Sequence, residues 1–434
     1  MDPAIIGALF LVVMVTLIAL GIPIAIVLAG TGALGFFVIA SPIHAETQLV
    51  LNFWERGTSF VLTAGPLYLL MGQLVFRTRI AEDLYDCIYK WLGWLPGGLA
   101  IASVVACAGF GAVSGGSATA VATMGPMCMP EMRKYKYQNR LATSAIASAG
   151  TLGILIPPSL FLLVYGLWTE TSIAALFIAG IVPGIILTAA FSLTILVMCR
   201  RRPELGPPGP RFPWSERISS LSKLLPTTLI FLLVIGGIYG GAFDPTEAAA
   251  IGVVGVLVVA GVMRRLSWRA VREALMSTMH TTAMLFMIIF GGHIIGRFIV
   301  LTDLTSSLIG AIDTLELSAS ALLVVFTLMY IVLGMILDIW AMLILTIPFV
   351  FPLIVAKGID PVWFGIFVIM MCELAAITPP IGLNVYVMAK VAPEVPIGEI
   401  FLGIVPFFFT ALAVIALLMA FPGLAVWLPG LAFR

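Results

Sequence analysis

The chain has 434 residues, of which 61% are hydrophobic and only 10% are charged, and its formal net charge is +1. Soluble domains carry about 25% charged residues, so this composition cannot give a protein of this size a polar surface. The mean hydropathy of +1.16 instead predicts an all-α polytopic membrane protein embedded in a lipid bilayer. At about 20 residues per span, the chain holds roughly a dozen hydrophobic segments. Nothing in the charge balance indicates a nucleic-acid partner.

Cysteine and histidine are too dispersed to predict a metal centre or a cofactor. The cysteines follow no C-x-x-C spacing, which favours small buried hydrophobic residues over redox or metal chemistry; they are Cys87, Cys107, Cys128, Cys199 and Cys372. The first ~40 residues are apolar and have neither a basic leader nor a cleavage site, so we interpret them as retained transmembrane helices rather than a signal peptide.

Hydrophobic segments follow one another through the first half, and Gly21-Ile22-Pro23 separates the first two. The segments cover 4–20, 24–41, 59–76, 97–130, 141–168 and 172–199. Amphipathic pieces at 48–57 and 77–90 lie between them, and the second suits the membrane interface.

The proline-rich stretch 200–223 is the longest polar segment and is predicted to link two halves. The hydrophobic segments after it cover 224–242, 248–263, 280–301, 318–356, 361–389 and about 400–428, and the last is predicted to be one long helix.

Lysine and arginine gather in alternate connecting segments, at 77–90, 131–140, 200–223 and 264–272. The loops at 42–47, 169–171, 243–247 and 302–316 have none. The positive-inside rule places the first set in the cytoplasm and the second set outside.

Segment 91–130 therefore enters and leaves from the cytoplasmic side, and its break at Ser114–Ser117 predicts a re-entrant helical hairpin. Segment 318–356, broken near Asp338, predicts a second hairpin that enters from outside. Gly116 precedes Pro157 by 41 residues, and Asp338 precedes Pro379 by the same 41. A hairpin followed by a Pro-Pro-broken helix thus occurs twice with opposite orientation, which is the inverted-topology repeat of secondary transporters.

Each Pro-Pro pair ends one half-helix and begins another, because proline lacks the donor that a helix needs. Carbonyls freed at the first half-helix can bind a cation, and the next N-terminus favours an anion. Oxygen ligands beside these breaks suit a hard cation such as Na⁺; the candidates are Thr151, Ser159, Thr378 and Asn384. The alternative is a kink with a packing role.

The first hairpin tip offers small residues, close backbone approach and hydroxyl oxygens at Ser114, Gly115, Gly116, Ser117 and Thr119. A small-residue run by itself is explained by close helix packing. Its position opposite Pro157-Pro158 favours a binding site.

Three ionisable residues lie within apolar stretches. Arg297 has a fork matched to a carboxylate, although it could instead snorkel to the interface. Asp338 is costly in a membrane unless it is paired, hydrated or bound to a cation. Glu373 is similar, but could bond to neighbouring backbone donors.

Five motifs together resemble the large membrane subunit of TRAP transporters, the DctM-like family, over essentially the whole chain. They are GAVSGGSATAVATMGPMCMPEM (111–132), SAGTLGILIPPSL (148–160), GGIYGGAFDPTEAAA (236–250), LGMILDIWAMLIL (333–345) and ITPPIGLNVYV (377–387). The resemblance implies an elevator-type, Na⁺-driven importer of organic acids in the bacterial inner membrane, not an enzyme. It also implies two partners, a small four-helix membrane subunit that is a separate chain here and a periplasmic solute-binding protein.

The resemblance further implies where the ligands bind. One Na⁺ would lie between the first tip and the Gly150–Pro158 region, and a second between the Asp338 tip and Thr378–Asn384. The sodium-binding residues expected are Ser114, Gly115, Gly116, Ser117, Thr151, Pro157, Asp338, Thr378, Pro379, Gly382 and Asn384. Substrate would bind between the tips, contacting Arg297, Ser117, Thr119, Asp338 and Trp340. Many relatives have hydroxyl residues where this chain has Ile339 and Trp340.

The domains expected are scaffold helices at 1–90 and 224–317, the linker 200–223, and two repeats at 91–199 and 318–434. The repeats would move against the scaffold. A self-sufficient Na⁺/carboxylate symporter is the alternative within transport. An intramembrane enzyme using Asp338 or Glu373 lacks a nucleophile or second paired acid in the sequence.

Overall fold

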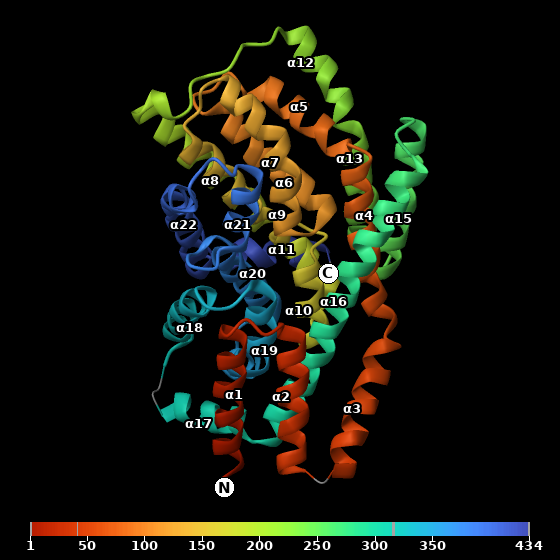
Figure 1. Ribbon diagram of the computed structural model, residues 1–434, viewed down its shortest axis with the longest axis vertical. Coiled ribbons are helices and arrows are strands. Elements are labelled where there is room, and N and C mark those ends of the chain that lie inside the picture. The colour runs from red at the N-terminus through yellow and green to blue at the C-terminus, as the bar shows by residue number, and fades with distance from the viewer. Residues whose placement is uncertain (1, 41, 315–316, 433–434) are drawn as a thin grey trace.

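The computed structural model describes residues 2–40, 42–314 and 317–432, and every regular element in that part of the chain is a helix (Figure 1). Seven of these described segments are long and apolar enough to cross a membrane, or eight if the bent pair Trp214–Lys223 and Leu225–Tyr239 is one span. Shorter apolar helices of 10–17 residues accompany them. The all-helical architecture follows from the composition, since a helix satisfies its own backbone in an apolar surrounding.

The N-terminal part contains α1 (Pro3–Ala19), α2 (Ile24–Ile39), α3 (Pro42–Gly57) and α4 (Ala64–Arg77). Asp2 begins α1 by accepting a hydrogen bond from Ala4 N at 3.0 Å. The segment predicted as a loop at 42–47 followed by a short amphipathic piece is one helix, α3. A 3₁₀ turn, Phe60–Thr63, then leads into α4.

The first predicted hairpin is confirmed: α5 (Ile80–Leu92) leads into α6 (Gly98–Ser114), which meets α7 (Ser117–Lys134) at two glycines. Gly115 has φ of +61°, a left-handed conformation that glycine adopts without steric penalty. A side chain there would also lie 2.9 Å from Pro158 O. The hairpin tip therefore packs directly against the first Pro-Pro pair.

The first broken helix consists of α8 (Asn139–Ala149), α9 (Leu152–Leu155) and α10 (Leu160–Thr169). Pro157 and Pro158, joined by a cis peptide bond, cannot donate to a helical carbonyl, so the helix stops before them. Ser159 begins α10 by accepting a hydrogen bond from Leu162 N at 3.4 Å. The long helix α11 (Ile173–Arg201) follows, as predicted.

The middle of the chain has more helix than the sequence predicted. Its elements are η2 (Pro203–Leu205), α12 (Trp214–Ser220), η3 (Leu221–Lys223), α13 (Leu225–Phe231), the π-helical η4 (Leu232–Gly236), α14 (Gly237–Tyr239), α15 (Pro245–Val262), α16 (Trp268–Leu301) and α17 (Leu304–Thr314). The predicted basic loop 264–272 is wrong in part, because Ser267 caps α16 by accepting from Ala270 N. The predicted loop 302–316 likewise contains α17, and residues 315–316 lie outside the described residues.

The second hairpin and broken helix are also confirmed as α18 (Ala319–Gly334), α19 (Ile339–Ala356), α20 (Pro361–Ile377) and α21 (Leu383–Val391). The prediction of one last helix at about 400–428 is wrong. The chain forms α22 (Ile397–Ala420) and α23 (Gly423–Ala432), because Pro422 disfavours helical geometry at Phe421 and has no donor of its own.

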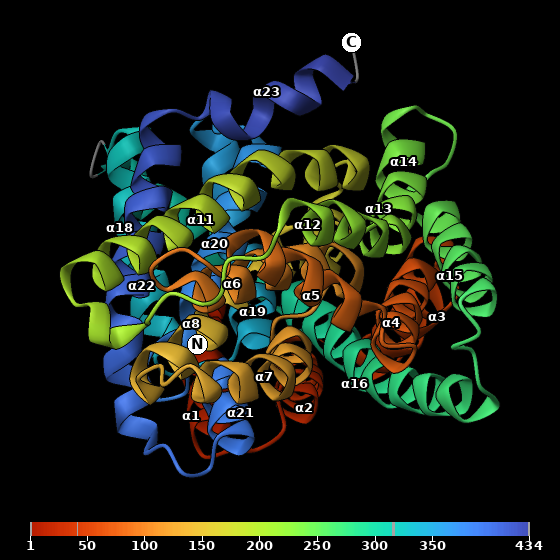
Figure 2. The same ribbon diagram turned by 90° about the horizontal axis from the view of Figure 1, so that it is seen from above.

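In Figure 1, α5, α12 and the turn between α15 and α16 lie at the upper end, whereas α1, α2, α3 and α17 lie at the lower end. The basic segments thus gather at one end of the molecule, as the charge pattern predicted. Seen from above, α4, α15 and α16 stand to one side of α6, α11 and α20 (Figure 2).

Long-range side-chain hydrogen bonds divide into two sets. One set joins α4 to the start of α15 and α3 to α16, through Tyr68 OH to Pro245 O at 2.7 Å and Arg297 to Glu55 at 2.8 Å. The other joins the two hairpin-containing halves, through Tyr165 OH to Pro361 O at 2.8 Å and Thr194 to Thr410 at 2.8 Å. Two groups of helices are therefore each bonded internally.

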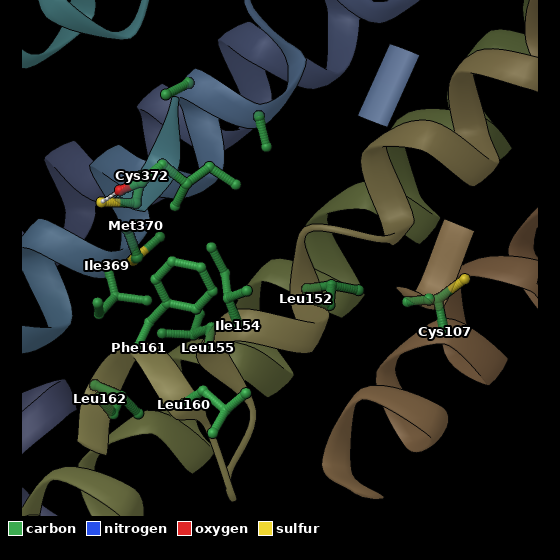
Figure 3. Close-up of a cluster of buried hydrophobic side chains, with 14 of the residues drawn as sticks. Cys107, Leu152, Ile154, Leu155, Leu160, Phe161, Leu162, Ile369, Met370 and Cys372 are labelled. Carbon is green, nitrogen blue, oxygen red and sulfur yellow. Dashed lines mark hydrogen bonds between the residues drawn. The ribbon is translucent and has the colours of Figure 1, made fainter. Parts of the chain in front are cut away.

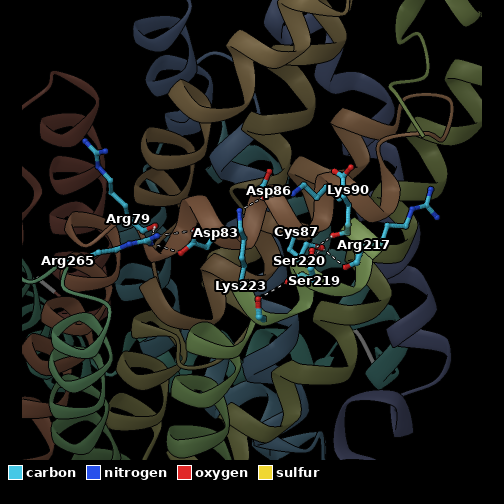
Figure 4. Close-up of polar contacts among 12 residues, drawn as sticks. Arg79, Asp83, Asp86, Cys87, Lys90, Arg217, Ser219, Ser220, Lys223 and Arg265 are labelled. Atoms are coloured by element: carbon cyan, nitrogen blue, oxygen red, sulfur yellow. Dashed lines mark hydrogen bonds and ion pairs between the residues drawn. The ribbon is translucent and has the colours of Figure 1, made fainter. Parts of the chain in front are cut away.

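The helix α5 bonds to both groups and to the segment 200–223. Its Tyr89 OH donates to Tyr135 OH, after α7, at 3.2 Å, and its acidic side chains form ion pairs (Figure 4). Asp83 pairs with Arg265 at 2.5 Å and Asp86 with Lys223 at 2.7 Å. Burial alone would raise the pKa of Asp86, but the hydrogen bond and charge of Lys223, helped by Lys90, hold it below its ordinary value. The carboxylate is therefore ionised near neutral pH, and this contact weakens only as the pH falls through that lowered pKa.

Apolar side chains from both repeats share one core. Figure 3 shows Leu155 and Phe161 packed beside Ile369 and Met370, which come from opposite halves of the sequence. All five cysteines are free and buried there or in neighbouring layers, as the sequence predicted.

We expect Gly111→Ala to lower the free energy of unfolding by about 1–3 kcal/mol, because overpacking cannot be relieved by a side-chain rotation. The added methyl would lie 2.6 Å from Gly153 Cα, in the backbone of α9. Thermal unfolding of the purified protein in detergent measures this loss. Gly261→Ala is the matched control, since its methyl meets nothing within 4 Å and Gly→Ala in an open helix costs nothing. Equal shifts of Tm for both variants would contradict the close packing of α6 on α9.

Candidate functional site

The first hairpin tip and the first break meet backbone to backbone. A methyl on Gly153 would lie 3.0 Å from Gly116 O, and one on Gly150 would lie 3.1 Å from Ser117 O. Carbonyl oxygens of the tip therefore lie close to Gly150, after α8, and to Gly153 of α9. Among the predicted residues, Gly115, Gly116, Ser117, Thr151 and Pro157 belong to this region.

Two buried hydroxyl groups flank this contact without a hydrogen-bond partner in the described chain. They are Ser114 Oγ, at the end of α6, and Ser148 Oγ, at the end of α8. Thr151 Oγ1, by contrast, already donates to Ser148 O at 2.8 Å. A buried hydroxyl without a partner costs about 1–3 kcal/mol, and a bound water or ion would offset that cost. Ser114 was predicted from the sequence, whereas Ser148, the second residue before Gly150, was not.

Asn384, which the sequence grouped with the second break, bonds instead to the first hairpin tip and to α8. Its Oδ1 accepts a hydrogen bond from Ser117 Oγ at 2.8 Å, and its Nδ2 donates to Ala147 O at 3.0 Å. The side chain is fully buried. Asn384 therefore fixes the start of α21 to the tip of the first hairpin, across the two repeats. Sequence spacing could not find this contact, because it joins residues 267 positions apart.

At the second tip, Asp338 is the cap of a helix. Asp338 Oδ1 accepts a hydrogen bond from Ala341 N at 2.7 Å and so begins α19. Trp340 stacks on Phe161 of α10 with ring centroids 3.9 Å apart. The aromatic pair occupies the approach from the second tip to the first break. The second tip thus contacts the first repeat through apolar side chains, whereas the first tip contacts the second repeat through a polar hydrogen bond.

At the second break the threonine hydroxyl is already engaged. Thr378 Oγ1 donates to Leu374 O at 2.6 Å. Gly382 caps α21 in a left-handed conformation with φ of +39°, after Pro379 and Pro380. Thr119 belongs to the first hairpin instead. It lies in the first turn of α7, and its carbonyl accepts a hydrogen bond from Thr123 Oγ1 at 2.7 Å. The second break therefore brings together Thr378, Pro379 and Gly382, while Asn384 points away to the first tip.

The sequence left open whether Glu373 bonds to neighbouring backbone donors. In the structure it does not. It is 2% exposed, and both of its carboxylate oxygens lack a partner in the described chain. It lies in α20, one turn before Thr378.

Arg297 lies away from both tips, in a cavity of about 570 Å³ between two groups of helices. One wall comes from α2, α3 and α16, and the other from α10 and α19. Arg297 Nη1 donates to Gln48 Oε1 at 2.8 Å, and its Nη2 donates to Glu55 Oε2 at 2.8 Å. It is therefore paired with α3 and does not snorkel freely.

Comparison with protein-family models identifies what this architecture belongs to. Residues 11–424 match the family described as tripartite ATP-independent periplasmic transporter, DctM component. The chain belongs to this family. It is therefore a large permease subunit of a TRAP transporter, a multi-pass membrane protein and not an enzyme, which confirms the family predicted from the five motifs.

Individual relatives agree with this assignment. The chain is similar to the C4-dicarboxylate TRAP transporter large permease protein DctM of Pseudomonas aeruginosa, at 33% identity over 88% of this chain and 89% of that protein. It is also similar to the ectoine/5-hydroxyectoine TRAP transporter large permease protein UehC of Ruegeria pomeroyi, at 31% identity over 98% of this chain and 99% of that protein.

A solved structure shares the fold. The crystal structure of the YdaH transporter of Alcanivorax borkumensis, described as having an unusual topology, superposes with a TM-score of 0.63. The superposition covers 100% of this chain and 99% of the YdaH chain, at 16% sequence identity. At this identity the likeness concerns the fold alone.

We expect the Ser117–Asn384 bond to couple the two repeats by about 1 kcal/mol. Asn384→Ala leaves Ser117 Oγ and Ala147 O unpaired, so it should cost more than Ser117→Ala. The double variant should lose about 1 kcal/mol less than the sum of the single losses. Unfolding of the purified variants in detergent measures all three. Strictly additive losses would show that the two side chains do not interact.

Proposed function

We propose that this TRAP permease subunit couples inward Na⁺ movement to uptake of a small organic anion that carries a carboxylate or related acid group. It would work in the bacterial inner membrane with a small four-helix membrane subunit and a periplasmic solute-binding protein. The observation that carries the proposal is the repeated hairpin and broken helix, with unpartnered buried hydroxyls at the first pair.

The first break supports a cation site on chemical grounds. Na⁺ is a hard cation that prefers oxygen ligands, and the tip supplies the carbonyls of Gly116 and Ser117 together with Ser114 Oγ. Ser148 Oγ adds a second unpartnered hydroxyl, and the C-terminal ends of α8 and α9 add partial negative charge. A second Na⁺ at Asp338, Thr378, Pro379 and Gly382 remains part of the proposal. Ile339 and Trp340 leave that site fewer side-chain oxygens.

The substrate class follows from charge. The two relatives are named for C4-dicarboxylates and for ectoine, and both kinds of compound carry a carboxylate. The cavity that contains Arg297 offers this chain a cationic route for such an anion. We propose that the anion then binds between the tips, near Ser117, Thr119, Asp338 and Trp340.

An elevator mechanism is supported by the two sets of hydrogen bonds. We propose that segments 91–199 and 318–434 move together against a scaffold of 1–90 and 224–317. Glycines stand at the boundary: a methyl on Gly72 of α4 would lie 2.7 Å from Ser114 Cα, and one on Gly292 of α16 would lie 2.3 Å from Ile344. Close contact without interlocking side chains suits sliding.

The alternative is a self-sufficient Na⁺/carboxylate symporter, which has the same inverted repeats. The family description, a tripartite periplasmic transporter, favours dependence on partners. Co-purification with a small membrane subunit separates the two.

Uptake into proteoliposomes tests the proposal directly. With both partners present, uptake of succinate or ectoine should require an inward Na⁺ gradient and should stop when K⁺ replaces Na⁺. It should also stop when the binding protein is left out. Uptake that persists without the Na⁺ gradient would refute the coupling, and uptake without the binding protein would favour the symporter.

The sodium site has a separate test. Na⁺ that binds only the folded protein should raise its Tm in NaCl relative to choline chloride. Ser114→Ala and Ser148→Ala should each reduce this difference, with little loss of Tm in choline chloride because neither hydroxyl has a partner. Ser103→Ala, also on α6, is the control, since Ser103 Oγ donates to Leu99 O at 2.9 Å and lies outside the site. A full Na⁺ effect in both site variants would exclude this site.

A further inference from the structure

The cavity beside Arg297 contains a second arginine that the sequence analysis did not single out. Arg56, at the end of α3, lines the same space as Gln48, Trp168, His293 and Arg297. Trp168 and His293 stack with ring centroids 4.1 Å apart and planes 3° from parallel. Phe36 and Phe351 add apolar surface. A volume of about 570 Å³ lies within the range of small-molecule sites.

The two arginines are not equivalent. Arg297 is engaged by Gln48 and Glu55 at 2.8 Å each, so its charge is offset and its nitrogens are held by α3. Arg56 is half-buried, and its guanidinium makes no hydrogen bond or ion pair within the described residues. Arg297 repels it, while Glu55 and Glu170 attract it without forming a close pair.

A half-buried guanidinium without a partner is an unfavourable arrangement, because its desolvation is not compensated. The neighbouring Arg297 adds to that cost. An acid group with two oxygens would compensate it, since it can accept paired hydrogen bonds from the guanidinium fork. The stacked rings and phenylalanines would cover the carbon part of the same molecule.

We propose that Arg56 is the group that binds the substrate's acid group at the scaffold side of this cavity, and that Arg297 is a positioning residue. The ligand class is a small organic carboxylate or sulfonate with a carbon body that packs on the Trp168–His293 stack. Glu55 and Gln48 hold Arg297 in place. Because the nitrogens of Arg297 are engaged in this way, Arg56 is the guanidinium that is available to a ligand. This inference rests on the proposed function and specifies which residue binds the anion in this cavity, before the anion reaches the tips.

Arg56→Gln tests the charge. In the complete complex reconstituted in proteoliposomes, with succinate and ectoine as probes, the KM for uptake should rise at least about tenfold. Arg272→Gln is the matched control, an exposed arginine near the start of α16 outside the cavity, and it should keep the wild-type KM. A wild-type KM in Arg56→Gln would overturn the inference while leaving the proposed function intact.

Chemical rescue separates charge from structure. All five native cysteines are buried, so Arg56→Cys introduces the accessible thiol in an otherwise protected background. A 2-aminoethyl methanethiosulfonate reagent adds a positive charge there and should bring KM back toward the wild type, whereas the sulfonatoethyl reagent should not. Loss that neither reagent restores, or that both restore equally, would overturn the assignment.

The role of Arg297 is tested by removing its pair. The double variant Glu55→Gln with Arg297→Gln removes both charges and leaves Arg56 in place. Its KM should therefore stay within about threefold of the wild type, a smaller change than the loss of a hydrogen-bonded acid group would cause. A rise as large as that of Arg56→Gln would make Arg297 the contact and overturn the inference. A wild-type complex that takes up neither probe under any gradient would refute the proposed function and this inference together.

Discussion

The structure depends on one constraint, which is that backbone polar groups in an apolar chain must find partners within the protein. A helix satisfies them internally, so each interruption needs its own solution. At the first break, glycines allow it: Gly111 and Gly153 bring α6 onto α9, and Gly115 brings the hairpin tip onto Pro158 O. These contacts bury carbonyls and hydroxyls together in a small volume. The same packing that makes the breaks tolerable therefore also gathers the oxygen atoms that a cation needs.

The division of hydrogen bonds has a physical consequence for motion. Within an apolar interior, a side-chain hydrogen bond across a sliding boundary would have to break without water to replace it. Bonds such as Tyr68 to Pro245 and Tyr165 to Pro361 instead tie helices within one group or the other. Ion pairs of α5, such as Asp83 with Arg265, lie at the upper end of the molecule, where water can exchange with them (Figure 1). Along the boundary in between, Gly72 and Gly292 make the closest contacts, beside the cavity that contains Arg56 and Arg297.

Much of this was readable in the sequence because it is local. Pro-Pro pairs stop helices wherever they occur, and the 41-residue spacing of tip and break needs no knowledge of packing. Charge runs indicated which segments gather at one end. The sequence failed where two distant segments decide the outcome. Asn384 was assigned by spacing to its own repeat but bonds Ser117. Arg56 was not singled out in the sequence, because the cavity that it shares with Arg297 is formed by segments far apart in the chain. The cap on α16 at Ser267 was missed because arginines after it resembled a loop.

The two repeats share a plan but differ in the chemistry of their crossing contacts. The first tip reaches the second repeat through a buried amide, and the second tip reaches the first repeat through Trp340 stacked on Phe161. An amide bridge leaves oxygen atoms close by, whereas an aromatic stack fills its space and excludes water. Ion affinity in such a pair of sites need not be equal, since ligand number sets it. If the first site holds its ion more tightly, that ion orders the tip through Ser117 and Asn384, and the second tip is left to respond to the substrate through Trp340. The two repeats would then share one backbone fold, while the first binds the ion and the second responds to the substrate.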